Sequence, residues 1–291
     1  MLKGSYVALV TPFKNNKIDY NALENLIDFH LENKTDGLVL CGTTAEAPSL
    51  AGDERESLIR FVMQKNQGQM KIGIGTGTNN LQHTISATLR AQNQKADFAM
   101  VITPYYNKPT QNGLYHYFKA VSDAVEIPFI IYNVPGRTGV NISVETTLKL
   151  ANECKNIVGI KEASGDLVQV TAITKDAPEG FCVMSGEDAL NLPIISCGAT
   201  GAVSVTGNIT PAKCSELICN ALDGNLKKAA KLHKELLELN NVMFIETNPI
   251  PVKTALNLMG KIEPELRLPM YKMNDENTEE LKKVLTKYKL I

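Results

Sequence analysis

One lysine in this sequence stands where its side chain could act as a nucleophile. Lys161 ends the apolar run at 157–160 (IVGI), and a strand there would direct its stem into or along the protein interior. An ammonium group loses hydration in such a place, and this loss favours the free amine that can attack a carbonyl carbon. The alternative is a structural lysine paired with a carboxylate such as Glu162 or Glu187. The tyrosines and threonines that end the other apolar runs favour the chemical interpretation.

A tyrosine at the end of the preceding apolar run could move protons near that amine. Tyr132 follows the run at 128–131 (PFII), so neighbouring strands would bring its phenol close to Lys161. A phenol can give and take protons when nearby hydroxyls stabilise its anion. The alternative is a core tyrosine whose hydroxyl has a structural partner.

Two further segments carry groups suited to binding carboxylates. Thr43 and Thr44 follow a glycine, and the N–H groups and hydroxyls of such a turn can hold a carboxylate without a charged side chain. Helix capping ahead of Glu46 is the alternative for these threonines. Arg137 lies in a loop between two glycines, where it could grip a second carboxylate, unless it is a solvated surface arginine.

Metal and nucleotide sites are not indicated by the sequence. The four His form no HxH or HExxH pattern and the six Cys show no CxxC spacing, so we expect no metal and buried free thiols. The glycines at 73–77 (GIGTG) lack the spacing of a dinucleotide-binding loop, and no phosphate-binding GxxxxGK[ST] segment occurs. We therefore expect no cofactor.

The composition is that of an ordinary globular protein. The chain has 291 residues, 30 Lys and Arg against 31 Asp and Glu, and 44% hydrophobic residues. A net charge this close to zero argues against a nucleic-acid partner. The longest uncharged stretch, 189–212, holds too many polar residues to cross a membrane, and the N-terminus is typical of a first strand rather than a signal peptide. We expect a cytoplasmic protein without membrane contact.

Eight short apolar runs rich in Val and Ile recur at nearly constant spacing. Continuous apolar runs indicate strands buried on both faces, as in a parallel sheet. Amphipathic segments predict helices between them, for example 20–33 with Asp19 as its N-cap. Eight strand–helix units favour a closed (β/α)8 TIM barrel over an open sheet. The predicted strands are 5–11, 37–41, 71–76, 97–103, 128–133, 157–161, 181–185 and 200–205.

The sequence predicts a barrel domain over residues 1–222 followed by a C-terminal helical extension. The barrel carries the site, because catalytic groups of such barrels lie where strands end. Helical patterns at 225–244, 251–258 and 276–288 predict that residues 223–291 form a helical layer packed on the barrel, which could build an oligomer interface.

Five motifs, in matching order and spacing, resemble the dihydrodipicolinate synthase family of the class I aldolase and N-acetylneuraminate lyase superfamily. They are GTTAE (42–46), TPYYNKP (103–109), YNVPGRTG (132–139), GIKEASGD (159–166) and NPIPVK (248–253). The resemblance covers essentially the whole chain. It implies a lyase of lysine and diaminopimelate biosynthesis that condenses pyruvate with L-aspartate 4-semialdehyde through an imine, without a metal or an organic cofactor.

The resemblance also implies a catalytic role for four residues. Lys161 would form the imine with pyruvate, and Tyr132 would donate and accept protons. Thr43 would link that tyrosine to Tyr106, which in the family comes from the neighbouring subunit of a tight dimer. A homotetramer built as a dimer of dimers is therefore implied.

Four further residues match substrate-binding positions of the family. Thr44, with the backbone around Val203, would hold the carboxylate and carbonyl region of pyruvate. Gly186 would be a further substrate-binding residue, and Arg137 would bind the carboxylate of the semialdehyde. One position departs from the pattern, because Ala45 replaces a glycine that has more backbone freedom. We expect activity to survive this change, since both threonines of the motif remain.

Two other functions stay open at this point. A related pyruvate-dependent aldolase or lyase, such as N-acetylneuraminate lyase or a sugar-acid aldolase, would share the lysine and the YN-P loop. Those enzymes open the first motif with a serine and lack the arginine, so Thr43 and Arg137 favour the synthase. A non-catalytic metabolite-binding barrel would not need an amine beside a phenol.

Feedback inhibition by L-lysine is expected to be weak or absent. At positions matching the family's lysine site, Asn79 and Tyr105 are retained, but His83 replaces an acidic residue and Gly52 and Arg55 replace histidines. The ammonium group of lysine thus loses a charged partner, and Arg55 adds like charge. Titration of the synthase rate with L-lysine checks this expectation, and strong inhibition at submillimolar lysine would contradict it.

Overall fold

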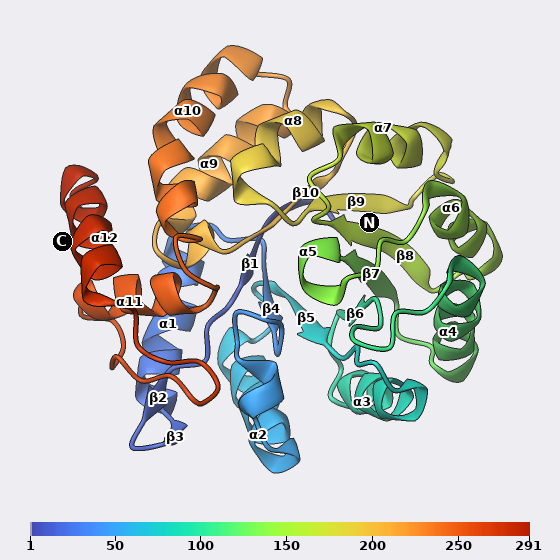
Figure 1. The fold of residues 1–291 in the computed structure, drawn as a ribbon, viewed down its shortest axis with the longest axis horizontal. Helices are drawn as coiled ribbons and strands as arrows, with labels where there is room; N and C mark the ends of the chain where they lie inside the picture. Colours follow the sequence, from blue (N-terminus) through green and yellow to red (C-terminus); the bar gives the residue numbers. More distant parts are fainter. Residues whose placement is uncertain (1) are drawn as a thin grey trace.

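The computed structural model describes residues 2–291, which form a closed barrel of parallel strands surrounded by helices (Figure 1). Neighbouring strands follow chain order around the barrel, and β10 pairs with β1 to close it. The barrel strands are β1 (Gly4–Ala8), β4 (Gly37–Leu40), β5 (Lys71–Gly75), β6 (Phe98–Ile102), β7 (Phe129–Asn133), β8 (Ile157–Glu162), β9 (Cys182–Ser185) and β10 (Gly201–Ser204). Each overlaps a predicted run, so the predicted (β/α)8 TIM barrel is confirmed.

Helices connect the strands and cover the outside of the barrel (Figure 1). They are α1 (Tyr20–Glu32), α2 (Gly52–Asn66), α3 (Leu81–Asn93), α4 (Gln111–Ala124), α6 (Val144–Glu153), α7 (Leu167–Asp176), α8 (Asn191–Ser196) and α9 (Pro211–Leu222). Several of these helices begin at an N-cap residue whose side chain binds a backbone N–H of the first turn. The side chain of Asp19 accepts a hydrogen bond from the N–H of Ala22, as predicted for an N-cap. Asp166 caps α7 in the same way.

Most of the shortest elements were not predicted. They are the hairpin of β2 (Phe13–Lys14) and β3 (Lys17–Ile18), the short helix α5 (Pro135–Thr138), and the 3-10 turns η1 (Ala47–Ser49) and η3 (Thr206–Asn208). The 3-10 turn η2 (Asp188–Leu190) lies inside the segment 188–196, whose apolar pattern predicts a helix. Segments this short carry no measurable periodicity. The hairpin had one local signal, because Asn15 and Asn16 both adopt the positive φ that a tight hairpin turn needs.

Two layers of buried side chains hold the barrel together. The outer layer lies between strands and helices, and the inner layer fills the barrel with residues such as Tyr6, Phe98, Met100, Met184 and Val203. Successive side chains of a strand point to opposite faces. Accordingly, β7 places Ile131 in the outer layer and Tyr132 in the inner one. In β8, Ile160 belongs to the outer layer, and the next residue, Lys161, faces the interior over the ring of Tyr132.

The C-terminal part of the chain packs against the barrel as three helices, α10 (Leu226–Val242), α11 (Ile250–Leu258) and α12 (Asp275–Lys287). Helix α10 lies along α9, and α12 packs on both α10 and α11 (Figure 1). This placement agrees with the predicted helical extension. The division into domains 1–222 and 223–291 stays a prediction.

Several sequence expectations concern features other than the barrel. Within residues 2–291, no helix combines the length and apolar character needed to cross a bilayer. The same residues hold no group of three or more His, Cys, Asp or Glu placed to bind a metal ion. All six cysteines are free, and Cys41, Cys154, Cys182 and Cys214 are buried. Cys219 is exposed, contrary to expectation, because it lies on the solvent face of α9.

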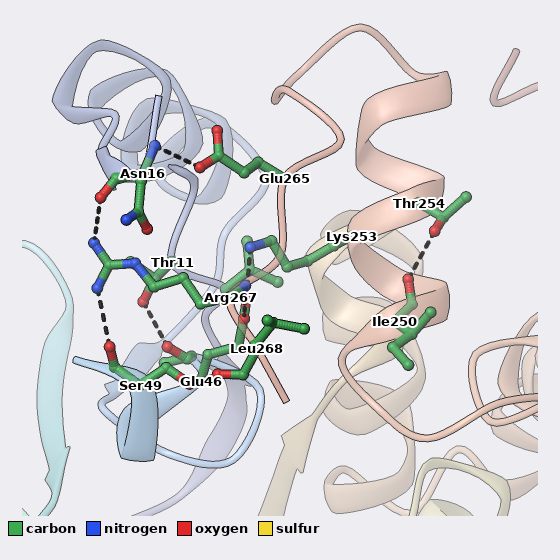
Figure 2. Close-up of polar contacts among 12 residues, drawn as sticks. Thr11, Asn16, Glu46, Ser49, Ile250, Lys253, Thr254, Glu265, Arg267 and Leu268 are labelled. Atoms are coloured by element: carbon green, nitrogen blue, oxygen red, sulfur yellow. Dashed lines mark hydrogen bonds and ion pairs between the residues drawn. The ribbon is translucent and has the colours of Figure 1, made fainter. Parts of the chain in front are cut away.

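A buried ion pair ties α11 to the loop after β4 (Figure 2). Nζ of Lys253 lies 2.5 Å from Oε1 of Glu46, and the two side chains are 1% and 0% exposed. Burial lowers the pKa of Lys253, because desolvation disfavours the charged amine, while the carboxylate of Glu46 opposes this shift. The backbone N–H of Arg267 donates to the other oxygen of Glu46 at 2.9 Å. The C-terminal segment therefore supplies both partners of this carboxylate.

Replacing Lys253 by methionine is expected to destabilise the protein by about 3–5 kcal/mol, because Glu46 would remain buried without its cation. The double variant K253M/E46Q removes both charges and should recover most of that loss. Urea unfolding measures the free energy of unfolding of each protein. The control is K287M, which removes an exposed ion pair with Glu238 and should change stability little. A K253M protein as stable as the unmodified chain would show that the pair is not structural.

Candidate active site

A cavity of about 320 Å³ opens at the end of the barrel where the strands finish. Three predicted site residues line it, namely Thr43, Tyr132 and Arg137. Tyr105, which follows the predicted strand at 97–103, and Asn248 also line it, although neither was predicted as a catalytic or substrate-binding residue. The walls come from the loops after β4 to β7 and from the C-terminal segment.

Lys161 is buried at the end of β8, where only 4% of the residue is exposed. Its register partner on β7 is Tyr132, and its Nζ lies 4.3 Å from the centroid of the tyrosine ring. Among residues 2–291 Lys161 forms no ion pair. The structure therefore places a buried amine beside a phenol-bearing side chain, as the sequence predicts.

The two carboxylates considered as structural partners of Lys161 do not pair with it. Glu162 points to the opposite face of β8, where its oxygens accept hydrogen bonds from Nδ2 of Asn133 at 3.1 Å and Nε2 of Gln169 at 3.0 Å. Glu187, the other candidate, forms no ion pair with Lys161; burial raises the pKa of Glu187, and the nearby charge of Lys161 only partly opposes this shift. Within the described chain, the alternative of a lysine held by a carboxylate is wrong.

Two predicted substrate-binding residues lie close to this lysine and tyrosine. Gly186 leaves room for the lysine stem, because a Cβ at this position would lie 2.9 Å from Cε of Lys161. Val203 is buried in the same interior cluster as Tyr132. Asp188 fixes the chain just beyond Val203, since its Oδ2 accepts hydrogen bonds from the N–H groups at positions 205 and 206, at 2.8 and 2.9 Å.

The turn after β4 carries the two predicted threonines. Thr43 lines the cavity, whereas Thr44 is buried and its Oγ1 accepts a hydrogen bond from Nδ2 of Asn248 at 3.0 Å. The helix-capping alternative is wrong, because the N-cap of η1 is Glu46 and neither threonine hydroxyl accepts a hydrogen bond from a backbone N–H among the described residues. Thr43 is therefore available to the cavity that it lines, whereas Thr44 lies buried behind it.

Ala45 fits this turn without the freedom of a glycine. The left-handed positions around it are Cys41 and Glu46, both at φ 53°, and Ala45 has no positive φ. Its carbonyl accepts a hydrogen bond from Oγ1 of Thr11 at 2.9 Å. The backbone thus gives no reason for the alanine to impair the turn.

Arg137 stands at the cavity mouth, on the short helix α5. Its Nη2 donates a hydrogen bond to the backbone carbonyl of Asn248 at 3.2 Å. The residue is exposed, so its remaining N–H groups are accessible to an anion. The C-terminal segment therefore holds one end of the guanidinium at the cavity mouth, and the role of Arg137 in binding a carboxylate stays a prediction.

Tyr106 is the predicted site residue that points into solvent in the single chain. It is 89% exposed and adopts φ 72°, while its neighbour Tyr105 lines the cavity. No hydrogen bond joins the hydroxyls of Thr43 and Tyr132 within the part of the chain that the structure describes. The relay through these three hydroxyls stays a prediction.

The assembled groups are suited to carbonyl chemistry. A buried amine can form an imine with a keto acid, a phenol on the adjacent strand can exchange protons, and a guanidinium at the mouth can hold a carboxylate. Asn248 was not predicted as a site residue from the sequence, although it contacts both Thr44 and Arg137. Its only signal in the sequence was its place in the NPIPVK motif.

Known proteins resemble this chain over nearly its full length. The model of the Dihydrodipicolinate synthetase family matches residues 1–288. The 4-hydroxy-tetrahydrodipicolinate synthase of Aquifex aeolicus is 48% identical over 290 residues, which cover 100% of this chain and 99% of the relative. The crystal structure of dihydrodipicolinate synthase from Aquifex aeolicus matches with a TM-score of 0.98 and 48% identity over 99% of both chains. That of the chloride-inhibited enzyme from Acinetobacter baumannii, complexed with pyruvate, matches with a TM-score of 0.98 and 40% identity over 100% of both.

These matches agree with the five motifs in the sequence and with the geometry of the cavity. Fold, motif order and full-length identity point to the same group of proteins. The chain belongs to the dihydrodipicolinate synthase family.

Proposed function

We propose that this protein condenses pyruvate with L-aspartate 4-semialdehyde to 4-hydroxy-tetrahydrodipicolinate, the first committed step of the diaminopimelate route to lysine. The observation that carries the proposal is the buried amine of Lys161, which lies over the ring of Tyr132 and has no carboxylate partner. Relatives named for this synthase, and the structure of one complexed with pyruvate, support it. Arg137 at the mouth favours this activity over a sugar-acid aldolase, because the second substrate carries a carboxylate.

Lys161 forms and then releases the covalent intermediate. Its Nζ attacks the keto carbon of pyruvate, and loss of water leaves a protonated imine. The imine nitrogen withdraws electrons, so the methyl group gives up a proton and an enamine forms. The enamine carbon attacks the aldehyde carbon of the semialdehyde, whose oxygen takes up a proton. The amino group of the semialdehyde then displaces the lysine nitrogen, which closes the ring and restores the free amine.

Tyr132 exchanges protons with these intermediates. It lies on the strand next to Lys161, and Thr43 shares its cavity. Tyr106 from a second copy of the chain completes the relay, and its exposure in the single chain fits a side chain that a partner covers. The working assembly is a homotetramer built as a dimer of dimers.

Separate groups hold the carboxylates of the two substrates. Thr44, with Gly186 and the backbone around Val203, holds pyruvate near the amine. Arg137 binds the carboxylate of the semialdehyde at the mouth, where a guanidinium can make two charge-assisted hydrogen bonds.

Borohydride reduction in the presence of pyruvate is expected to attach the keto acid to Lys161, because hydride converts an imine into a stable amine. Mass spectrometry of the digested protein locates the adduct. The K161A variant should carry none, whereas the control K175A, which removes an exposed lysine, should be labelled like the unmodified protein. An adduct on another lysine, or none at all, would refute the proposed chemistry.

Replacing Arg137 by alanine should raise KM for the semialdehyde by about tenfold to a hundredfold, since hydrogen bonds to a charged group are lost. KM for pyruvate should change much less. Steady-state kinetics with each substrate varied in turn measure both constants. The matched control is R60A, which removes an exposed arginine from α2. Equal increases of the two KM values in R137A would speak against the assigned role.

A further inference from the structure

The C-terminal segment of residues 248–267 forms hydrogen bonds to Glu46, the last residue of the turn at 42–46 (Figure 2). Glu46 ends this turn in a left-handed conformation, which non-glycine residues rarely adopt. Its two carboxylate oxygens accept hydrogen bonds from Nζ of Lys253 at 2.5 Å and from the backbone N–H of Arg267 at 2.9 Å. Both donors come from the C-terminal segment, so this segment fixes the end of the turn.

Asn248 holds the threonine of the same turn. Its Nδ2 donates to Oγ1 of Thr44 at 3.0 Å, although the two residues are 204 positions apart in the sequence. Both residues are buried, with Asn248 at the wall of the cavity. Because Asn248 comes from the segment that binds Glu46, its amide has a fixed position relative to the turn.

This bond decides how the hydroxyl of Thr44 can act. A threonine hydroxyl has one proton to donate and lone pairs that accept. Oγ1 of Thr44 accepts from Asn248 and has no other hydrogen-bond partner among residues 2–291. Its proton therefore has no acceptor among the described residues, and in the proposed function it is donated to a carboxylate oxygen of pyruvate. A hydrogen-bond acceptor in place of the amide would take that proton instead.

We infer that Asn248 is a positioning residue for pyruvate, whose amide makes the Thr44 hydroxyl a donor to the keto-acid carboxylate. This inference rests on the proposed function, in which Thr44 binds that carboxylate. Asn248 acts on pyruvate through the threonine and makes no bond to pyruvate itself.

The test compares KM for pyruvate in N248A, T44V and the double variant N248A/T44V. Each single substitution should raise KM by about threefold to tenfold, the size expected when one hydrogen bond is lost. The double variant should match T44V alone, because Asn248 then has no hydroxyl to orient. KM for the semialdehyde and the melting temperature are measured on the same proteins.

A second variant, N248D, keeps the test decisive if alanine disturbs packing. Aspartate has nearly the size of asparagine, but in its ionised form it only accepts hydrogen bonds and so takes the proton of Thr44. N248D should raise KM for pyruvate at least as much as N248A. The matched control is N257A, because the side-chain amide of Asn257 donates to the carbonyl of Ile262 in the same segment and is not hydrogen-bonded to the turn at 42–46. N257A should lower the melting temperature and leave both KM values unchanged.

Independent, multiplying effects in the double variant, or an unchanged KM for pyruvate in N248D, would overturn the inference. The borohydride adduct of the unmodified protein separates this failure from that of the proposed function. A missing adduct rejects the proposed function itself. A normal adduct together with unchanged KM values in the variants rejects only the role of Asn248.

Discussion

In the proposed mechanism, the chemistry of this protein depends on a buried amine that forms no ion pair among the described residues. Among the described residues two lysines are almost completely buried, Lys161 in the barrel and Lys253 in α11. Burying a charged group is costly unless an opposite charge compensates it. Glu46 compensates Lys253, which is therefore structural, whereas Lys161 forms no ion pair among the described residues and its amine lies over the face of the Tyr132 ring. The reactive lysine is distinguished by its missing partner rather than by its burial.

The barrel fold brings the other site residues to the same rim as this lysine. All strands of a parallel barrel end at one rim, so residues from β4 to β10 converge there although they are far apart in the sequence. Side-chain alternation along β8 also separates opposite charges, because Lys161 faces the interior and Glu162 faces a set of neutral amide donors. The carboxylate next to the amine in the sequence is thus kept from neutralising it.

Features that depend on short stretches of chain could be predicted from the sequence. Strand runs, the cap at Asp19 and the pairing of Tyr132 with Lys161 follow from alternation and spacing within neighbouring units. The contact of Asn248 with Thr44 could not be predicted, because only the folded C-terminal segment brings together residues 204 positions apart. The pairing of Lys253 with Glu46 is equally non-local, at 207 positions. The partners of Tyr106 could not be predicted either, because this residue is exposed to solvent in the single chain.

Steady-state turnover of the K161A variant tests the central claim most directly. Alanine removes the one buried amine without a carboxylate partner in the described chain and leaves the barrel core intact. The account predicts that turnover of pyruvate and the semialdehyde falls to the uncatalysed rate, while the circular dichroism spectrum stays that of the unmodified protein. Full turnover by K161A would contradict the account, however well the barrel folds.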